Sequence, residues 1–173
     1  LERQQIQRWT SLLLPPELVG SHVGGPVSHT TGRVADLGMR CLTALIAHAG
    51  IEWDITTCTA DELAQLAGWA GLYKELRGLL HTGDVVRVDP HDVENPLDPD
   101  TLLHGVVARD RGEAVFEYTR IRTSTAANPG RLRLPGLDPD RLYRVRHRDE
   151  AGPVHGLVIR QPEWWIRGEA LAS

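Results

Sequence analysis

Hydroxyl, imidazole and guanidinium side chains gather in one stretch near the start of the chain, between a short apolar segment and an amphipathic one. These polar residues are Ser21, His22, His29, Thr30, Thr31 and Arg33. A short buried strand that delivers a polar loop ahead of a helix commonly builds a functional site. The stretch is therefore the first candidate site. The alternative role is structural, in which these side chains hold a long loop in place by hydrogen bonds.

Three familiar kinds of chemistry do not fit this stretch. Ser21 lacks the Gly-x-Ser-x-Gly turn that exposes a hydrolase nucleophile. His22 and His29 have no third ligand nearby for a metal ion. The Gly24-Gly25 pair has neither the P-loop lysine nor a Gly-x-Gly-x-x-Gly run. We therefore expect no metal and no cofactor.

Two carboxylates form a second candidate. Glu52 and Asp54 alternate with Ile51, Trp53 and Ile55, so they would share one face of a strand. A paired-carboxylate site is one interpretation, with Asp54 the better candidate because it lies nearer the end of the strand. The other is that both side chains anchor backbone groups or an arginine.

Helices are predicted from apolar residues at helical spacing. The first covers residues 2–13, a second begins after Asp36 as its N-cap and ends near Gly50 as its C′ residue, and a third covers 60–82. Thr59 and Glu62 form a capping box at the start of the third helix. The expected buried stripe of that helix is Leu63, Leu66, Ala70, Tyr73, Leu76 and Leu80.

Short strands separate these helices, at Leu18–Val23 and Ile51–Ile55. The alternation of helix and strand predicts a parallel α/β fold. Two strands do not make a stable parallel sheet by themselves. The sequence also begins without Met, at Leu1-Glu2, in what reads as a helix. We therefore expect it to be part of a longer protein.

The composition changes near Gly83, after which short strands and turn residues alternate. This predicts two domains, 1–83 and 84–173, the second an antiparallel β-sandwich. A tight turn is expected at Arg109–Gly112 and a polar loop at Pro90–Pro99. The predicted strands are Val85–Val88, Leu102–Ala108, Ala114–Ile121, Arg131–Leu134, Leu142–Arg148 and Val154–Arg160.

Bulk properties exclude some functions. The net charge of -4 does not suit a nucleic-acid-binding surface. No apolar run approaches the roughly 20 residues that span a bilayer, so we expect no membrane partner. Cys41 and Cys58 lack metal-type spacing and read as free thiols, which favours a cytoplasmic location.

Several blocks of sequence resemble the C-terminal part of glycoside hydrolase family 36, the bacterial α-galactosidases or melibiases. The order and spacing of the first four blocks match that family. In the first domain the blocks are residues 13–23, Ser28–Arg33, His48–Ile55 and Leu72–Arg77; in the second they are Leu103–Val107 and Leu132–Val145.

The resemblance implies a fold and a mechanism. The chain would hold the last strands and helices of a (β/α)8 TIM barrel, followed by an antiparallel β-sandwich. Leu18–Val23 would be barrel strand seven, Ile51–Ile55 strand eight, and 60–82 the closing helix. The family hydrolyses terminal α-galactosides, such as melibiose and raffinose, with retention, using an aspartate nucleophile and an aspartate acid/base. Their Lys-Trp-Asp and Trp-Thr-Ser-Asp-like blocks do not occur here. We therefore expect no catalytic residue in this chain, and no hydrolysis by it alone.

The resemblance also implies partners. These are a small oligosaccharide substrate, the upstream barrel with its N-terminal domain, and further copies of the full-length protein. Because loops after barrel strands line the catalytic face, Ser21, His22, His29 and Arg33 would lie at the rim of the sugar site.

Two other functions stay open at this point. One is a non-catalytic carbohydrate-binding or assembly module, in which Trp164 and Trp165 would stack on sugar rather than pack the end of the chain. The other is a related α-glycosidase, such as an α-N-acetylgalactosaminidase. Arginines alternate along two predicted strands and are expected on a solvated outer face; they are Arg131, Arg133, Arg144, Arg146 and Arg148.

Overall fold

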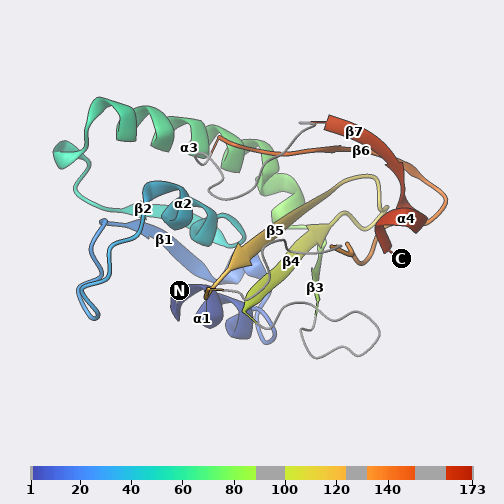
Figure 1. Ribbon diagram of the computed structural model, residues 1–173, viewed down its shortest axis with the longest axis horizontal. Helices are drawn as coiled ribbons and strands as arrows, with labels where there is room; N and C mark the ends of the chain where they lie inside the picture. Colours follow the sequence, from blue (N-terminus) through green and yellow to red (C-terminus); the bar gives the residue numbers. More distant parts are fainter. Residues whose placement is uncertain (1, 89–99, 124–131, 151–162, 173) are drawn as a thin grey trace. The chain divides into compact units, whose positions relative to one another are not determined.

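Figure 1 shows the computed structural model of the chain, which describes residues 2–88, 100–123, 132–150 and 163–172. The chain divides into two compact units. The first unit contains Leu1–His81 and Arg148–Arg160, and the second contains Thr82–His147 and Gln161–Ser173.

The first unit is built around two parallel strands, β1 (Gly20–Gly24) and β2 (His48–Glu52). The helix α2 (Leu37–Leu45) connects them, and α1 (Glu2–Thr10) and α3 (Ala60–Leu80) precede and follow the pair. The order α1-β1-α2-β2-α3 and the parallel pairing confirm the predicted α/β alternation. Short 3₁₀ turns lie at Pro16–Leu18 and Ile55–Thr57.

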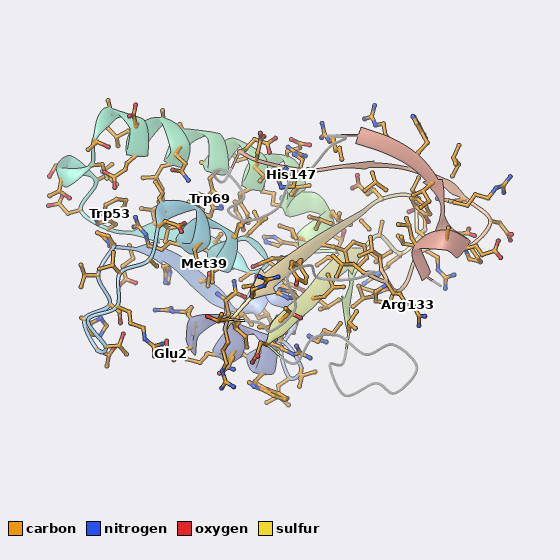
Figure 2. The ribbon with its side chains drawn as sticks, viewed as in Figure 1. Glu2, Met39, Trp53, Trp69, Arg133 and His147 are labelled. Atoms are coloured by element: carbon orange, nitrogen blue, oxygen red, sulfur yellow. The ribbon has the colours of Figure 1, made fainter. Side chains whose placement is uncertain are left out.

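One hydrophobic core joins these elements. Val23 of β1 is fully buried against the apolar faces of α2 and α3, and Trp69 of α3 lies between the two helices (Figure 2). The buried members of this core are Val23, Leu37, Cys41, Ala44, Leu45, Leu66, Trp69 and Leu72. Burying a valine or leucine side chain is worth about 1.5–3 kcal/mol.

The helix caps form as the sequence predicts. The Asp36 side chain accepts a hydrogen bond from the Met39 amide at 2.7 Å. Thr59 and Glu62 make both reciprocal bonds of the capping box: the Glu62 amide donates to Thr59 Oγ1, and the Thr59 amide donates to the Glu62 carboxylate. Short polar side chains predict helix starts well, because they accept hydrogen bonds from the amides that the first turn leaves unpaired.

Helix α1 ends earlier than predicted and buries a different face. It stops at Thr10 rather than residue 13. Hydroxyls at its end bond back to carbonyls, Thr10 Oγ1 to Ile6 and Ser11 Oγ to Arg8, and such bonds compete with helix continuation. Ile6 and Trp9 are more than half exposed, whereas Gln4 is buried and donates to Thr43 Oγ1 at 3.0 Å.

The second strand was expected at Ile51–Ile55 but covers His48–Glu52. Its predicted alternation included Asp54, whose side chain instead caps the following 3₁₀ turn and so ends the strand. Gly50 is correspondingly a mid-strand residue and not a helix C′ residue, because α2 already ends at Leu45. On α3, Leu63 of the expected stripe is 43% exposed, while Trp69 and Leu72, outside that stripe, are buried.

Arg148 ties a returning segment of the chain to α3 within the first unit. Its guanidinium donates to both carboxylate oxygens of Glu75, at 2.8 and 2.7 Å, and to Glu150 at 2.8 Å. These hydrogen bonds raise the pKa of Arg148, and the bond from Arg148 lowers the pKa of Glu150. Arg148 was expected on a solvated face of a strand; its side chain is 19% exposed and ion-paired instead.

The second unit contains two antiparallel sheets. Strands β3 (Asp84–Arg87), β4 (Thr101–Val107) and β5 (Ala114–Arg120) pair in the order β3-β4-β5, and β6 (Leu142–Arg146) pairs with β7 (Glu163–Arg167). The short helix α4 (Gly168–Ala172) follows β7. The two sheets share a core, in which Val107, Leu137 and Leu171 contact Tyr143, Val145 and Ile166.

Four predicted strands of this unit are confirmed to within one or two residues, and the predicted turn after β4 forms at Arg109–Gly112. Gly105 lets β4 and β5 approach closely, because an added Cβ would lie 2.3 Å from the Val115 carbonyl oxygen. Residues 132–134 form no strand, and Leu132 and Leu134 pack on the sheet instead. The predictions for Pro90–Pro99 and Val154–Arg160 lie outside the described residues.

The capping box yields a test of the start of α3. We expect Thr59→Ala to destabilise the first turn by about 1 kcal/mol, because the Glu62 amide loses its acceptor. Hydrogen exchange of the amides of Glu62 and Leu63, which both bond to Thr59, should accelerate about fivefold. Thr59→Ser keeps the hydroxyl and serves as the control. Equal exchange rates in both variants would contradict the assignment of this cap.

Candidate functional site

The two faces of the β1–β2 pair have different surroundings. Along β1 the exposure alternates, with Ser21 and Val23 fully buried on the side of the helices. Gly20, His22 and Gly24 therefore lie on the opposite side. Their register on β2 brings Gly50 beside His22, and Glu52 beside Gly24. His48, which registers with Gly20, lies on the same side at the amino end of β2. We call these six residues, Gly20, His22, Gly24, His48, Gly50 and Glu52, the open face.

Ser21 and His22 are neighbours in sequence but have opposite environments. Ser21 is buried on the helix side, where its hydroxyl accepts a hydrogen bond from the Gln7 side chain of α1. The His22 Nδ1 atom lies 3.5 Å from Oε2 of Glu52, and the two side chains are 45% and 77% exposed. Of the two residues, His22 is the one whose side chain reaches the open face.

The loop that follows β1 is held to itself and to α1. Thr31 and Arg33 make weak bonds within the loop: the Thr31 amide donates to Ser28 Oγ, and the Arg33 amide donates to Thr31 Oγ1. The Arg33 guanidinium forms an ion pair with Glu2 at 2.5 Å, and both side chains are more than half exposed. His29 is exposed at the tip of the same loop. The contacts of Thr31 and Arg33 support, for these two residues, the structural role that the sequence left open.

Asp54 also has a structural role. Its Oδ1 atom accepts from the Thr56 amide at 3.0 Å and from the Thr56 hydroxyl at 2.6 Å. These hydrogen bonds, the one from the hydroxyl first, lower the pKa of Asp54. Glu52 and Asp54 therefore do not form a paired-carboxylate site: one faces His22 and the other caps a turn.

Arg40 of α2 fixes the carboxyl end of β1, and nothing in the sequence pattern identified it. Its Nη1 atom donates to the Gly24 carbonyl at 2.6 Å, and its guanidinium lies 4.5 Å from the centre of the Trp53 ring. Figure 2 labels Trp53, which follows β2. Burial lowers the pKa of Arg40. This stack closes the end of the sheet next to Glu52.

The opposite end of the sheet carries an aromatic cluster. Tyr73 of α3 accepts a hydrogen bond from the Ala49 amide at 3.1 Å, and its hydroxyl lies 3.1 Å from Nε2 of His81. His48 stacks on His81 with ring centres 5.7 Å apart. These contacts join α3 to the start of β2. Across the residues that the structure describes, no group of three His, Cys, Asp or Glu side chains could hold a metal ion.

Comparison with known proteins gives two family matches. Residues 1–83 match the model of the melibiase family, and residues 103–165 match that of the glycosyl hydrolase family 36 C-terminal domain. The α-galactosidase of Escherichia coli is 37% identical over 98% of this chain, which corresponds to 22% of that protein. The α-galactosidase AgaA of Geobacillus stearothermophilus is 32% identical over 84% of this chain and 19% of its own length.

Solved structures similar to this chain are also α-galactosidases. The α-galactosidase of Lactobacillus brevis superposes on 99% of this chain with a TM-score of 0.79 at 27% identity, and 21% of that protein is covered. AgaA, in a complex with raffinose, superposes on 98% of the chain with a TM-score of 0.78 at 29% identity, again over 21% of its length. The chain thus spans about a fifth of these relatives.

These matches place the chain in a family of glycoside hydrolases. Within that class the chain belongs to family 36, the melibiases, and represents the C-terminal part of that family. The resemblance inferred from the sequence blocks is therefore confirmed.

The two cysteines give a testable difference in reactivity. Cys41 is buried in α2, and burial raises the pKa of its thiol to about 12, so its thiolate fraction at pH 8 is only ~10⁻⁴. Cys58 is half-buried, and its pKa is raised less. We expect iodoacetamide to label Cys58 well before Cys41, as read by peptide mass spectrometry, with Cys41 labelled only after denaturation. Faster labelling of Cys41 would contradict this environment.

Proposed function

We propose that the full-length protein carrying this chain is a retaining α-galactosidase that hydrolyses terminal α-galactosides of the melibiose and raffinose type. The observation that carries the proposal is the 37% identity to the Escherichia coli α-galactosidase over 98% of this chain. The raffinose complex of the related AgaA protein supports the substrate class.

In this proposal, residues 1–83 supply the end of a (β/α)8 barrel. Strand β1 is the seventh barrel strand, β2 the eighth, and α3 the closing helix. The parallel pairing of β1 and β2, with α2 as the crossover, supports this role. So do apolar side chains that this unit leaves exposed, which suit contact with further parts of a barrel; they include Ile6, Trp9, Leu12, Leu13, Ile51 and Ile55.

Residues 84–173 form the C-terminal β-sandwich in the same proposal. The core shared by the three-stranded sheet and the β6–β7 ribbon supports it. The role of this domain is non-catalytic: it packs on the barrel or mediates assembly of the full-length protein, which we propose is a cytoplasmic homo-oligomer. The free thiols Cys41 and Cys58 suit a reducing compartment.

The proposed chemistry divides between this chain and the residues that precede it. One upstream aspartate attacks the anomeric carbon, and a second protonates the leaving oxygen and then activates water. Retention requires the two carboxyl groups about 5–5.5 Å apart. This chain supplies neither group. Its part is to complete the barrel and to line the sugar site. Of the residues expected to contact substrate, Ser21 is buried against α1 and Arg33 is paired with Glu2, which leaves His22 and the exposed His29.

A carbohydrate-binding or assembly module is the second candidate function. Trp165 on β7 favours it, because its side chain is 62% exposed and lies opposite Arg144 in the β6–β7 register. Galactoside titration followed by tryptophan fluorescence distinguishes the two. A signal that Trp165→Ala abolishes, with no hydrolysis by the full-length protein, would favour the module.

The principal prediction concerns turnover. The full-length protein should hydrolyse p-nitrophenyl α-galactoside, whereas residues 1–173 alone should give no activity above buffer, because both catalytic carboxylates are upstream. The control is the full-length protein with the aspartate of its Lys-Trp-Asp block changed to Asn, which should be inactive. Turnover by the purified chain alone, co-eluting with it through successive columns, would overturn the proposal.

A further inference from the structure

The open face carries no aliphatic side chain. Its members are three glycines, two histidines and one glutamate, whereas the helix side of the same strands presents Val23 and Ala49 to the core. The interior of a barrel is ordinarily filled by bulky branched residues. Glycines leave space beside His22 and Glu52 that an aliphatic residue would fill. The composition of this face therefore suits a bound polar group better than dry packing.

Glycine also sets the position of the His22 ring. A Cβ atom added at Gly50 would lie 3.1 Å from Cδ2 and 3.7 Å from Nε2 of His22, and one at Gly20 would lie 3.8 Å from Cε1. The imidazole thus lies across the two strands, directly over Gly50. A Cβ atom at position 50 would force the ring to shift.

Glu52 sets the orientation of the same ring. Its Oε2 atom is 3.5 Å from Nδ1 of His22, and a carboxylate beside one ring nitrogen favours the tautomer that carries the proton on that nitrogen. This leaves Nε2 of a neutral imidazole as a hydrogen-bond acceptor. The neighbouring charged groups are engaged elsewhere: Asp54 binds Thr56, and Arg40 binds the Gly24 carbonyl. Glu52 lies at the carboxyl end of its strand, the end at which barrel enzymes bind substrate.

We propose that His22 and Glu52 form a hydroxyl-binding pair that contacts the galactosyl unit of the substrate. One sugar hydroxyl donates to Nε2 of His22, and a second donates to the free oxygen of Glu52. The pair binds and orients the sugar, and takes no part in bond cleavage. This inference rests on the proposed α-galactosidase function and names two of the residues that its sugar site uses.

The test uses the full-length protein with p-nitrophenyl α-galactoside and its monodeoxygalactoside analogues. His22→Gln and Glu52→Gln should each lower kcat/KM about tenfold, which is the usual effect of losing one hydrogen bond to substrate. In the double variant, kcat/KM should fall by less than the product of the two single effects, because the two side chains act as one unit. His48→Gln is the matched control, because His48 lies on the same face but at the amino end of β2, stacked on His81, and it should leave kcat/KM unchanged.

The deoxy analogues separate binding from a structural role. On one monodeoxy substrate, wild type and His22→Gln should have the same kcat/KM, because that substrate already lacks the hydroxyl that the imidazole contacts. Should His22→Gln fail to fold, Gly50→Ala tests the pair from the opposite strand: its Cβ would lie 3.1 Å from Cδ2 of His22, so the ring must shift and kcat/KM should fall, by less than in His22→Gln. Equal kcat/KM in wild type and both single variants, or an equal defect on every deoxy substrate, would overturn the pair. Absence of turnover by the wild type would instead refute the proposed function.

Discussion

The first unit is governed by one constraint: a parallel sheet is buried on both faces in folded proteins. Helices α1, α2 and α3 cover one face of β1 and β2, with Val23 and Ser21 buried beneath them. The other face presents glycine, histidine and glutamate, and apolar residues around the unit are exposed. The pair therefore has the form of a segment of a larger sheet, which agrees with a chain that spans about a fifth of its relatives.

The strand alternation decides which candidate residues can act on a ligand. Ser21 and His22 both looked suitable in the sequence, but adjacent residues of a strand point to opposite faces. Ser21 consequently accepts a hydrogen bond from Gln7 of α1, while His22 lies beside Glu52 on the other face of the sheet. Which face of the sheet a residue occupies thus carries more functional information than the polarity of the whole loop.

Local chemistry was predictable where the signal is local. The Asp36 cap, the Thr59–Glu62 capping box and the turn after β4 depend on a few adjacent residues, and all three form as predicted. The position of β2 was not predictable in this way. Ile51–Ile55 has the alternation of a strand, but the Asp54 side chain caps a 3₁₀ turn and the strand ends before it. The pairing of His22 with Glu52 and the Arg40–Trp53 stack depend on register and crossover geometry, which one sequence does not encode locally. The strand β7 was likewise missed, since its tryptophans read equally well as terminal packing.

The central claim is that β1 and β2 are neighbouring strands of a closed barrel whose sugar site lies at their carboxyl ends. A crystal structure of the full-length protein with bound galactose tests it most directly. We predict that preceding parts of the chain supply a parallel strand along the outer edge of β1 and another along that of β2, with the sugar at the Gly24–Glu52 end. An outer edge of either strand left unpaired, or galactose bound away from that end, would contradict the account.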